Sequence, residues 1–177
     1  MTTLTITKSS DPINTLLVDL SGHLTYEAKT PFSFTKDITT ITRNGQIVAS
    51  IKWGTFGENK LTMGGITAPL KDVFPKAGSL SSSRVFTTAN GEGLKWKEKS
   101  KLYCVSTYND LTLATYNHRS LSAMFTGKKA TLDISPNAMH LLDILVVTWV
   151  IMAKKSVDKQ SEAVGDAAGS VASAVSG

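Results

Sequence analysis

The sequence predicts a mostly β domain that ends in one hydrophobic helix, and two observations predict this class. Short runs rich in Thr, Val, Ile and aromatic residues alternate with turn dipeptides from about residue 16 to residue 134. The period changes at Ser135, after which a long apolar run begins. A chain of 177 residues is long enough to bury a sizeable core. Several short strands at this spacing favour a barrel or a sandwich.

Residues 1–13 are polar and rich in Thr, and we expect a flexible N-terminal tail there. The first four strands form two pairs, divided by Ser21-Gly22 and by Asn44-Gly45. Asn-Gly favours a type I′ turn, because both central residues need positive φ. These strands are expected at 16–20, 24–29, 38–43 and 46–53. In the last of them, the residues that share the apolar face are Ile47, Ala49, Ile51 and Trp53.

Two further hairpins and a last strand complete the predicted sheet. Asn90-Gly91 and Asn109-Asp110 supply the turns of the hairpins. Residues 55–83 are less regular, and we expect one short strand and a long loop there. The remaining strands are expected at 84–88, 93–99, 102–108, 111–116 and 130–134.

A helix is predicted over residues 136–155. Its start at Ser135-Pro136 combines a capping hydroxyl with a proline where no amide donor is needed. The helix is apolar on nearly all sides, so it belongs inside protein or inside lipid. A membrane span needs about 20 mostly apolar residues, whereas the uncharged run 144–153 has 10. We therefore expect a buried core helix and no transmembrane span.

The domain is thus expected over residues 14–155. The tail at 156–177 is rich in Ala, Gly and Ser and has few large apolar side chains, so we expect it to be disordered. The single cysteine, Cys104, excludes a disulfide within the chain. Secretory signals typically have a basic segment followed by an apolar run, and the N-terminus lacks this pattern. These features predict a cytoplasmic setting.

The positive charge is concentrated in one stretch. Residues 84–129 carry a net charge of +5, equal to that of the whole chain. Such asymmetry favours an anionic partner, either phosphate headgroups or nucleic acid.

The order of a β meander and one wholly apolar C-terminal helix resembles the tubby C-terminal fold. Within that superfamily, the chain is similar to an uncharacterised fungal tubby-C-like domain family over roughly residues 13–155. The resemblance is carried by Ile47-Val48-Ala49-Ser50-Ile51-Lys52-Trp53, by Arg84-Val85-Phe86, Asn90-Gly91 and Lys95-Trp96-Lys97, and by Leu141-Leu142-Asp143-Ile144-Leu145-Val146-Val147-Thr148. Leu94 stands where the family more usually has an aromatic residue.

The resemblance implies a closed or nearly closed antiparallel β-barrel around the central helix, and it carries no established activity. The wider superfamily includes phosphoinositide-binding tubby domains and scramblase-like proteins. This sequence lacks the cysteine-rich segment and acidic calcium loop of the scramblases, so their calcium-dependent activity is not implied.

A basic strand is the main candidate binding surface. Strand alternation places Lys95, Lys97 and Lys99 on one face, opposite Leu94 and Trp96. Clustered cations attract anionic lipid at about 1 kcal/mol each near a membrane. The alternative is a solvated strand whose lysines discourage edge-to-edge pairing. The complete candidate set for an anionic ligand is Arg84, Lys95, Lys97, Lys99 and Lys101. Nucleic acid is a weaker candidate, because the tryptophan faces away from the lysines.

Other chemistry receives little support from the sequence. His140 and Asp143 are three residues apart on the helix and could contact each other, either lining a site or as the polar end of the helix. Cys104 lies in a strand beside apolar neighbours, which favours a buried thiol over a nucleophile. The scattered histidines predict no metal site, and no nucleophile elbow or phosphate loop is present. We expect no catalytic residues, metal or cofactor.

The sequence therefore predicts a non-catalytic intracellular domain that binds anionic lipid, such as a phosphoinositide, peripherally at a membrane. The alternative is a protein-interaction or scaffold domain without lipid binding.

Overall fold

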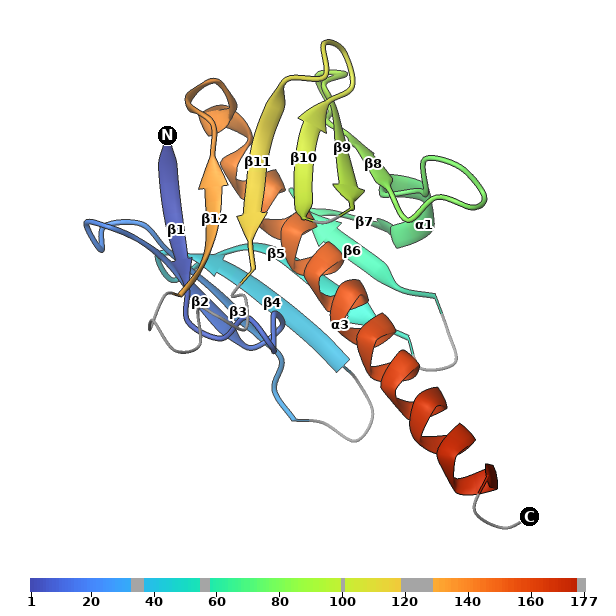
Figure 1. Cartoon of the computed structure of the whole chain (residues 1–177). Helices are drawn as coiled ribbons and strands as arrows, with labels where there is room; N and C mark the ends of the chain where they lie inside the picture. Colours follow the sequence, from blue (N-terminus) through green and yellow to red (C-terminus); the bar gives the residue numbers. More distant parts are fainter. Residues whose placement is uncertain (33–36, 55–57, 100, 119–128, 175–177) are drawn as a thin grey trace.

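The computed structural model describes the chain except for residues 33–36, 55–57, 100, 119–128 and 175–177, and it describes no side chain from residue 164 onward. The described residues form one antiparallel sheet of twelve strands and a long C-terminal helix (Figure 1). The strands are β1 (Thr2–Ile6), β2 (Thr15–Asp19), β3 (Thr25–Lys29), β4 (Asp37–Arg43), β5 (Gln46–Trp53), β6 (Lys60–Met63), β7 (Ile66–Pro69), β8 (Arg84–Thr87), β9 (Gly93–Glu98), β10 (Leu102–Ser106), β11 (Thr112–Asn117) and β12 (Ala130–Ile134).

The sheet curves around the helix but is not closed by strand pairing. Its order is β7-β6-β5-β4-β3-β2-β1-β12-β11-β10-β9-β8, so β7 and β8 are edges. The short helix α1 (Leu70–Val73) and the segment after it connect these edges, and this segment pairs with β8 through the Val85 N–H, which donates to the Pro75 carbonyl at 3.0 Å. The prediction of a mostly β antiparallel fold around one helix is confirmed. The prediction of a closed barrel holds only in part.

The N-terminus corrects another prediction. Residues 1–13 were expected to be a flexible tail, but β1 pairs with both β2 and β12 in the middle of the sheet. Leu4 and Ile6 alternate with threonines and are buried. This short alternation, together with the high β propensity of Thr, is the pattern of a half-buried strand.

The hairpin of β4 and β5 has the expected turn, but the residues on the buried face of β5 differ from the prediction. Asn44 and Gly45 have φ values of 49° and 82°, as a type I′ turn requires. Ala49 and Ile51 are buried, whereas Ile47 is 72% exposed. The register shifts so that Ile41 pairs with Ala49 and the next residue pairs with Ile47. This bulge reverses the alternation, so the prediction that Ile47 shares the apolar face is wrong.

The region 55–83 holds more regular structure than expected. It contains the two strands β6 and β7 and the helix α1, and residues 55–57 lie outside the described residues. The β6–β7 hairpin turns at Gly64-Gly65, where both glycines have positive φ. The glycine pair was therefore a hairpin signal.

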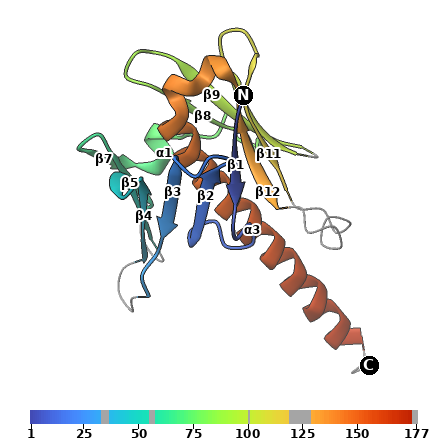
Figure 2. The same cartoon turned by 90° about the vertical axis from the view of Figure 1, so that its left-hand side faces the viewer.

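The C-terminal helix starts and ends differently from the prediction. It begins with a 3₁₀ segment, η1 (Pro136–Leu141), and continues as α3 (Leu142–Ala174). The prediction of disorder from residue 156 is wrong for 156–174, which are helical. Lys154 and Asp158 form an i,i+4 ion pair at 2.7 Å where the helix leaves the sheet, and the alanines beyond it are strong helix formers. Figures 1 and 2 show α3 projecting beyond the sheet.

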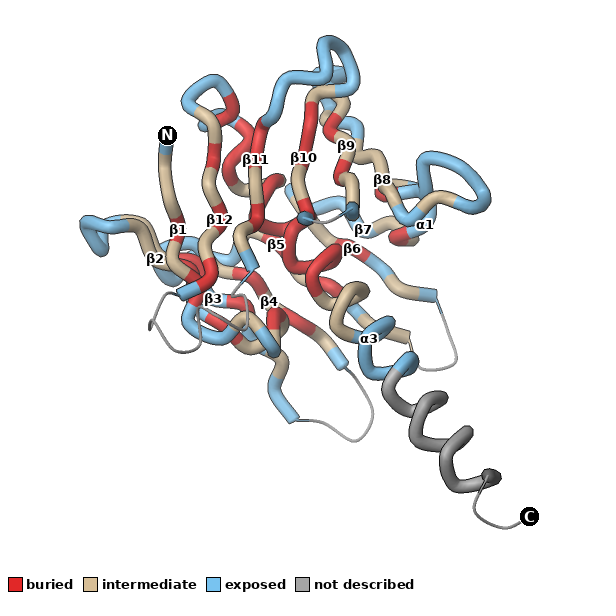
Figure 3. The backbone as a smooth tube through the Cα atoms, in the orientation of Figure 1, coloured by how far each residue is buried: buried red, intermediate tan, exposed pale blue. Residues whose placement is uncertain are grey.

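The first half of α3 lies in the core (Figure 3). Every residue from Leu145 to Ala153 is buried, as predicted for a core helix. The described residues contain one helix, Pro136–Ala163, that is long and apolar enough to cross a membrane by length and composition. Its most apolar window is 67% buried by the protein, as in the core helix of a globular domain.

Polar contacts fix α3 within the sheet. The Tyr26 hydroxyl donates to Asp143 at the start of the helix, where Arg43 also contacts this carboxylate at 3.3 Å. Further along, the Trp96 Nε1–H donates to Thr148 Oγ1 at 2.8 Å. The sheet has two ends along its strands. We call the end beside η1 the η1 end, and the opposite end, where α3 leaves the sheet, the exit end.

Candidate functional site

The five basic residues predicted as one surface lie in three different places. In the antiparallel register, Arg84 is opposite Trp96, whereas Lys95 and Lys97 are opposite Val105 and Tyr103. Directly opposed residues point to the same side of a sheet. Arg84 therefore points with Trp96 toward α3, and the two lysines point away from it.

Arg84 begins the edge strand β8 and contacts the segment that connects β7 to β8. Its guanidinium donates to the Phe74 carbonyl at 2.6 Å and lies 5.9 Å from the centre of the Phe74 ring. Burial lowers the pKa of Arg84 from its ordinary value. Its primary contacts are thus structural, because they connect β8 to the segment after α1.

Lys95 and Lys97 confirm the predicted alternation but do not form an open row. Leu94 and Trp96 are fully buried, and the two lysines are half-buried on the outer face. Lys97 Nζ contacts Asp110 at 3.1 Å. The charge on the outer face of β9 is therefore partly neutralised.

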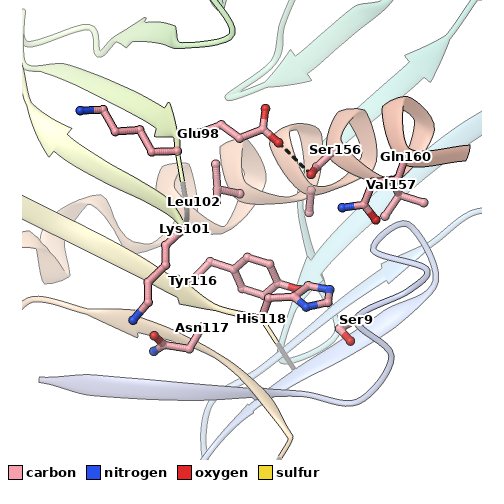
Figure 4. A pocket seen from close by; sticks show the side chains of 12 residues that line it. Ser9, Glu98, Lys101, Leu102, Tyr116, Asn117, His118, Ser156, Val157 and Gln160 are labelled. Carbon is pink, nitrogen blue, oxygen red and sulfur yellow. Dashed lines mark hydrogen bonds between the residues drawn. The ribbon is translucent and has the colours of Figure 1, made fainter. Parts of the chain in front are cut away.

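Lys99 and Lys101 instead line a groove where α3 leaves the sheet, and Figure 4 shows Lys101 at one side of this groove, near Asn117. The groove has a volume of about 560 Å³, within the range of ~300–1,000 Å³ typical of small-molecule sites. Both lysines are exposed, and neither side chain makes an ion pair within the described part of the chain. The groove is lined by Ser9, Glu98, Lys99, Lys101, Leu102, Tyr116, Asn117, His118, Ala153, Ser156, Val157 and Gln160.

The wall of the groove is held by contacts between the sheet and α3. The Ser156 hydroxyl donates to Glu98 Oε1 at 2.8 Å, which leaves the Glu98 carboxylate with a partner from the helix. Tyr116 packs edge-to-face on Trp149 and on His118, with ring centres 5.5 and 5.8 Å apart. Burial raises the pKa of Tyr116 to about 12, and a hydrogen bond with Ser9 acts in the opposite direction. The tyrosine is therefore neutral at physiological pH.

Basic side chains from distant parts of the sequence gather at the exit end. Strand ends and loops contribute Lys8, Lys29, Lys52, Lys60, Lys76, Arg84, Lys99, Lys101 and Lys129, and α3 contributes Lys154, Lys155 and Lys159. Acidic residues are fewer there, and three of them, Asp11, Glu58 and Asp158, are already paired with lysines. At the η1 end, the charged residues of turns and strand ends are mostly acidic, namely Asp19, Glu92, Asp110 and Asp143 beside Arg43.

The helix carries part of this positive field. Burial lowers the pKa of Lys155, and the neighbouring Arg84, Lys154 and Lys76 lower it further, whereas Asp158 acts in the opposite direction. Lys154 Nζ lies 5.1 Å from the centre of the Trp53 ring. The net charge of 84–129 did not reveal these helix lysines. Lys154-Lys155 directly follows the uncharged run 144–153 in the sequence, but only the fold shows that this pair lies beside the cations of the strand ends.

The remaining candidate residues have structural roles. His140 contacts Glu92 at 3.0 Å, and Asp143 contacts Tyr26 and Arg43, so the proposed His140–Asp143 contact does not form. Cys104 is buried, as predicted, and burial raises its pKa. Among the described residues, no group of three His, Cys, Asp or Glu side chains could hold a metal ion. Arg119 and Lys128, which contribute to the charge of 84–129, lie outside the described residues.

The arrangement can attract and bind an anion. Two lysines that make no ion pair with any described residue border a cavity at the end of the molecule where cations dominate, and the Gln160 amide and the His118 imidazole beside them can donate hydrogen bonds. Hydrogen bonds between an ammonium and a phosphate are charge-assisted and stronger than neutral ones.

Comparison with protein-family models shows the family of this chain. A family model, described as a family of unknown function (DUF6593), matches residues 10–158. The chain therefore belongs to this family. No curated protein and no solved structure matches the chain.

Proposed function

We propose that this member of the DUF6593 family is a non-catalytic, cytoplasmic module that binds anionic lipid peripherally, with the groove at the exit end as the headgroup site. The observation that supports it is the position of Lys99 and Lys101, which line the groove on the cation-rich end and make no ion pair within the described part of the chain. Because α3 projects from this end, the exit end cannot lie flat on a membrane surface. This geometry favours a single headgroup that enters the groove beside the helix. A phosphoinositide supplies such a headgroup. The proposal includes kinship with the fungal tubby-C-like proteins, which the helix inside a curved antiparallel sheet supports.

The test is a liposome flotation assay with a matched pair of variants. Lys99→Gln with Lys101→Gln should reduce binding to anionic liposomes about 30-fold, since each lysine near an anionic surface contributes about 1 kcal/mol. Lys95→Gln with Lys97→Gln removes the same charge from the outer face of β9 and should have a much smaller effect. Binding should weaken as salt rises, because exposed charges are screened over about 8 Å at physiological ionic strength.

Two results would contradict the proposal. One is equal flotation with neutral and anionic liposomes. The other is an equal loss in both double variants, which would indicate that net charge, and not the groove, determines binding.

A protein-interaction or scaffold domain is the second candidate, and a different observation supports it. Large apolar side chains are exposed at turns and strand ends of the η1 end: Leu20 is 89%, Ile47 72%, Ile66 72% and Tyr108 94% exposed. Exposed apolar groups that form contiguous patches mark interaction sites. This candidate predicts a partner whose binding is insensitive to salt and is lost in Ile47→Ser with Ile66→Ser, while the lysine variants leave it unchanged.

A further inference from the structure

The second large groove lies at the η1 end and has a different chemistry. Its volume is about 570 Å³, and it is formed by the β8–β9 turn, the β10–β11 turn and η1. Its polar side chains come from Asn90, Glu92, Ser106, Thr107, Asn109, Asn137 and His140, and no lysine or arginine of the described residues lines it. The groove is therefore not suited to the anion proposed for the exit end.

The two turns are connected by a backbone hydrogen bond and pack closely at Gly93. The Thr107 N–H donates to the Gly93 carbonyl at 2.9 Å, which extends the pairing of β9 and β10 into the turns. A Cβ at Gly93 would lie 2.0 Å from Thr107 Oγ1, so only glycine permits this approach. The groove is thus bounded by two turns that this hydrogen bond connects, and such a connection reduces the ordering needed when a ligand binds.

Two amide side chains in this groove have no hydrogen-bond partner among the described residues. In the described part of the chain, the Asn90 and Asn137 amides make no hydrogen bond. Each amide offers two donors and one acceptor. Glu92 is oriented by His140 at 3.0 Å, and its carboxylate retains further acceptor sites. These planar groups can bind pairs of adjacent hydroxyls through one donor and one acceptor at a time.

An exposed aromatic ring lies at the edge of the same groove. Tyr108 is 94% exposed and lines the groove. A polar residue could occupy this turn position equally well, so the fold itself does not require an aromatic ring there. Its N–H donates to Ser106 Oγ at 3.2 Å and fixes the backbone of the turn. An exposed ring offers an apolar face with a polar tip, which suits the CH-lined face of a sugar ring.

We propose that this groove binds a neutral polyhydroxylated ligand, a mono- or disaccharide or a polyol. Amides and a carboxylate would recognise the hydroxyls, and the Tyr108 ring would stack on the carbon face. This site is independent of the exit groove and of the function proposed for it. A site built to bind hydroxyls rejects analogues that lack them, because its polar groups then remain unpaired.

The test is NMR titration of the full chain with glucose, mannose, trehalose and mannitol, and with ethylene glycol as a diol without a sugar's arrangement of hydroxyls. At least one of the four should shift amide resonances of residues 90–93, 106–111 and 137–141 saturably, and ethylene glycol should not. Asn137→Ala and Tyr108→Ala should each weaken binding about tenfold, equivalent to ~1.4 kcal/mol, whereas Tyr108→Phe retains the ring and should bind nearly as well. Both residues are exposed, so unchanged melting temperatures should show that the variants fold.

Two controls separate this site from the exit groove and from non-specific effects. Lys99→Gln with Lys101→Gln should leave the sugar titration unchanged. No saturable shift with any of the four compounds, equal shifts with ethylene glycol, or shifts centred on the exit groove would each overturn the proposal.

Discussion

The two halves of α3 lie in different surroundings although they form one continuous helix. From Leu142 to Ala153 the helix is mostly buried inside the curved sheet, whereas the side chains from Lys154 to Val157 are half-buried and those from Asp158 to residue 163 are exposed. Burial of large apolar side chains stabilises the first half by ~1.5–3 kcal/mol per residue. An exposed i,i+4 ion pair such as that in the second half contributes only ~0.3–0.5 kcal/mol. The first part of the helix therefore stabilises the fold, and the part that follows it lines the exit groove.

The largest effect is expected from a charge in the buried half. Val147→Lys places an ammonium where the wild-type side chain has no exposed surface. An uncompensated buried charge costs several kcal/mol, which is comparable with the total stability of a domain of this size. We expect the variant to lose its cooperative unfolding transition in urea, monitored by tryptophan fluorescence. Lys159→Ala in the exposed half is the matched control and should change stability by less than ~0.5 kcal/mol.

A smaller effect is expected from the buried hydrogen bond between the Thr148 side chain of α3 and the Trp96 side chain of β9. Thr148→Val retains the shape of the side chain but leaves the Trp96 indole N–H without its acceptor. A buried donor without a partner costs about 1–3 kcal/mol. Chemical denaturation should show this loss, and Thr148→Ser should recover most of it because the hydroxyl remains. Equal stability of the Val and Ser variants would indicate that the hydrogen bond contributes nothing.

The pH dependence of stability reports on the wall of the exit groove. The pKa of Tyr116 is raised by burial from 10.0 to about 12 in the folded protein. Below pH 10 the phenol is neutral in both states and makes no difference. Between pH 10 and about 12 the unfolded chain releases this proton and the folded chain retains it, so the free energy of unfolding falls as pH rises.

Tyr116→Phe should reduce this alkaline slope without changing the dependence on pH below 9. Tyr26 and Cys104, whose pKa values are also raised, contribute in the same direction and remain in the variant. The measurement is therefore the difference between the two urea-unfolding curves across pH 9–12. Parallel curves would show that Tyr116 titrates normally in the folded protein.

The parts of the fold that were predictable from the sequence depend on local signals. Asn44-Gly45 determined a turn because few dipeptides tolerate two positive φ values, and the apolar run determined the buried part of α3. The strand β1 was missed because its alternation covers only Leu4 and Ile6, and its two neighbours in the sheet are distant in sequence or reached through a loop. Ile47 was assigned to the wrong face because a bulge reverses alternation without a clear signal in the sequence.

The candidate site was less predictable than the fold. Alternation separated Lys95 and Lys97 from Trp96 but could not show that Lys97 contacts Asp110 across the turn. It also could not show that Arg84 points inward, because that depends on its register with β9. The exit groove combines the ends of β9, β10 and β11 with residues 153–160 of a helix much later in the chain. Such a site follows from topology and not from spacing within the sequence.

The smallest effect is expected from shortening the projecting half of α3, and two end points distinguish which part of it contributes to the fold. A chain that ends at Ala163 retains every α3 residue that lines the exit groove, so its melting temperature should fall by less than about 2 °C. A chain that ends at Lys155 loses the bond from Ser156 to Glu98 and the Val157 side chain from the groove wall. Loss of about 1 kcal/mol should lower its melting temperature by ~2–4 °C. It should also bind anionic liposomes less well than the longer chain, because one wall of the groove is then missing. Equal melting temperatures for the two chains would show that Ser156 and Val157 contribute nothing to stability, and a large fall for the longer chain would show that residues after 163 pack on the domain.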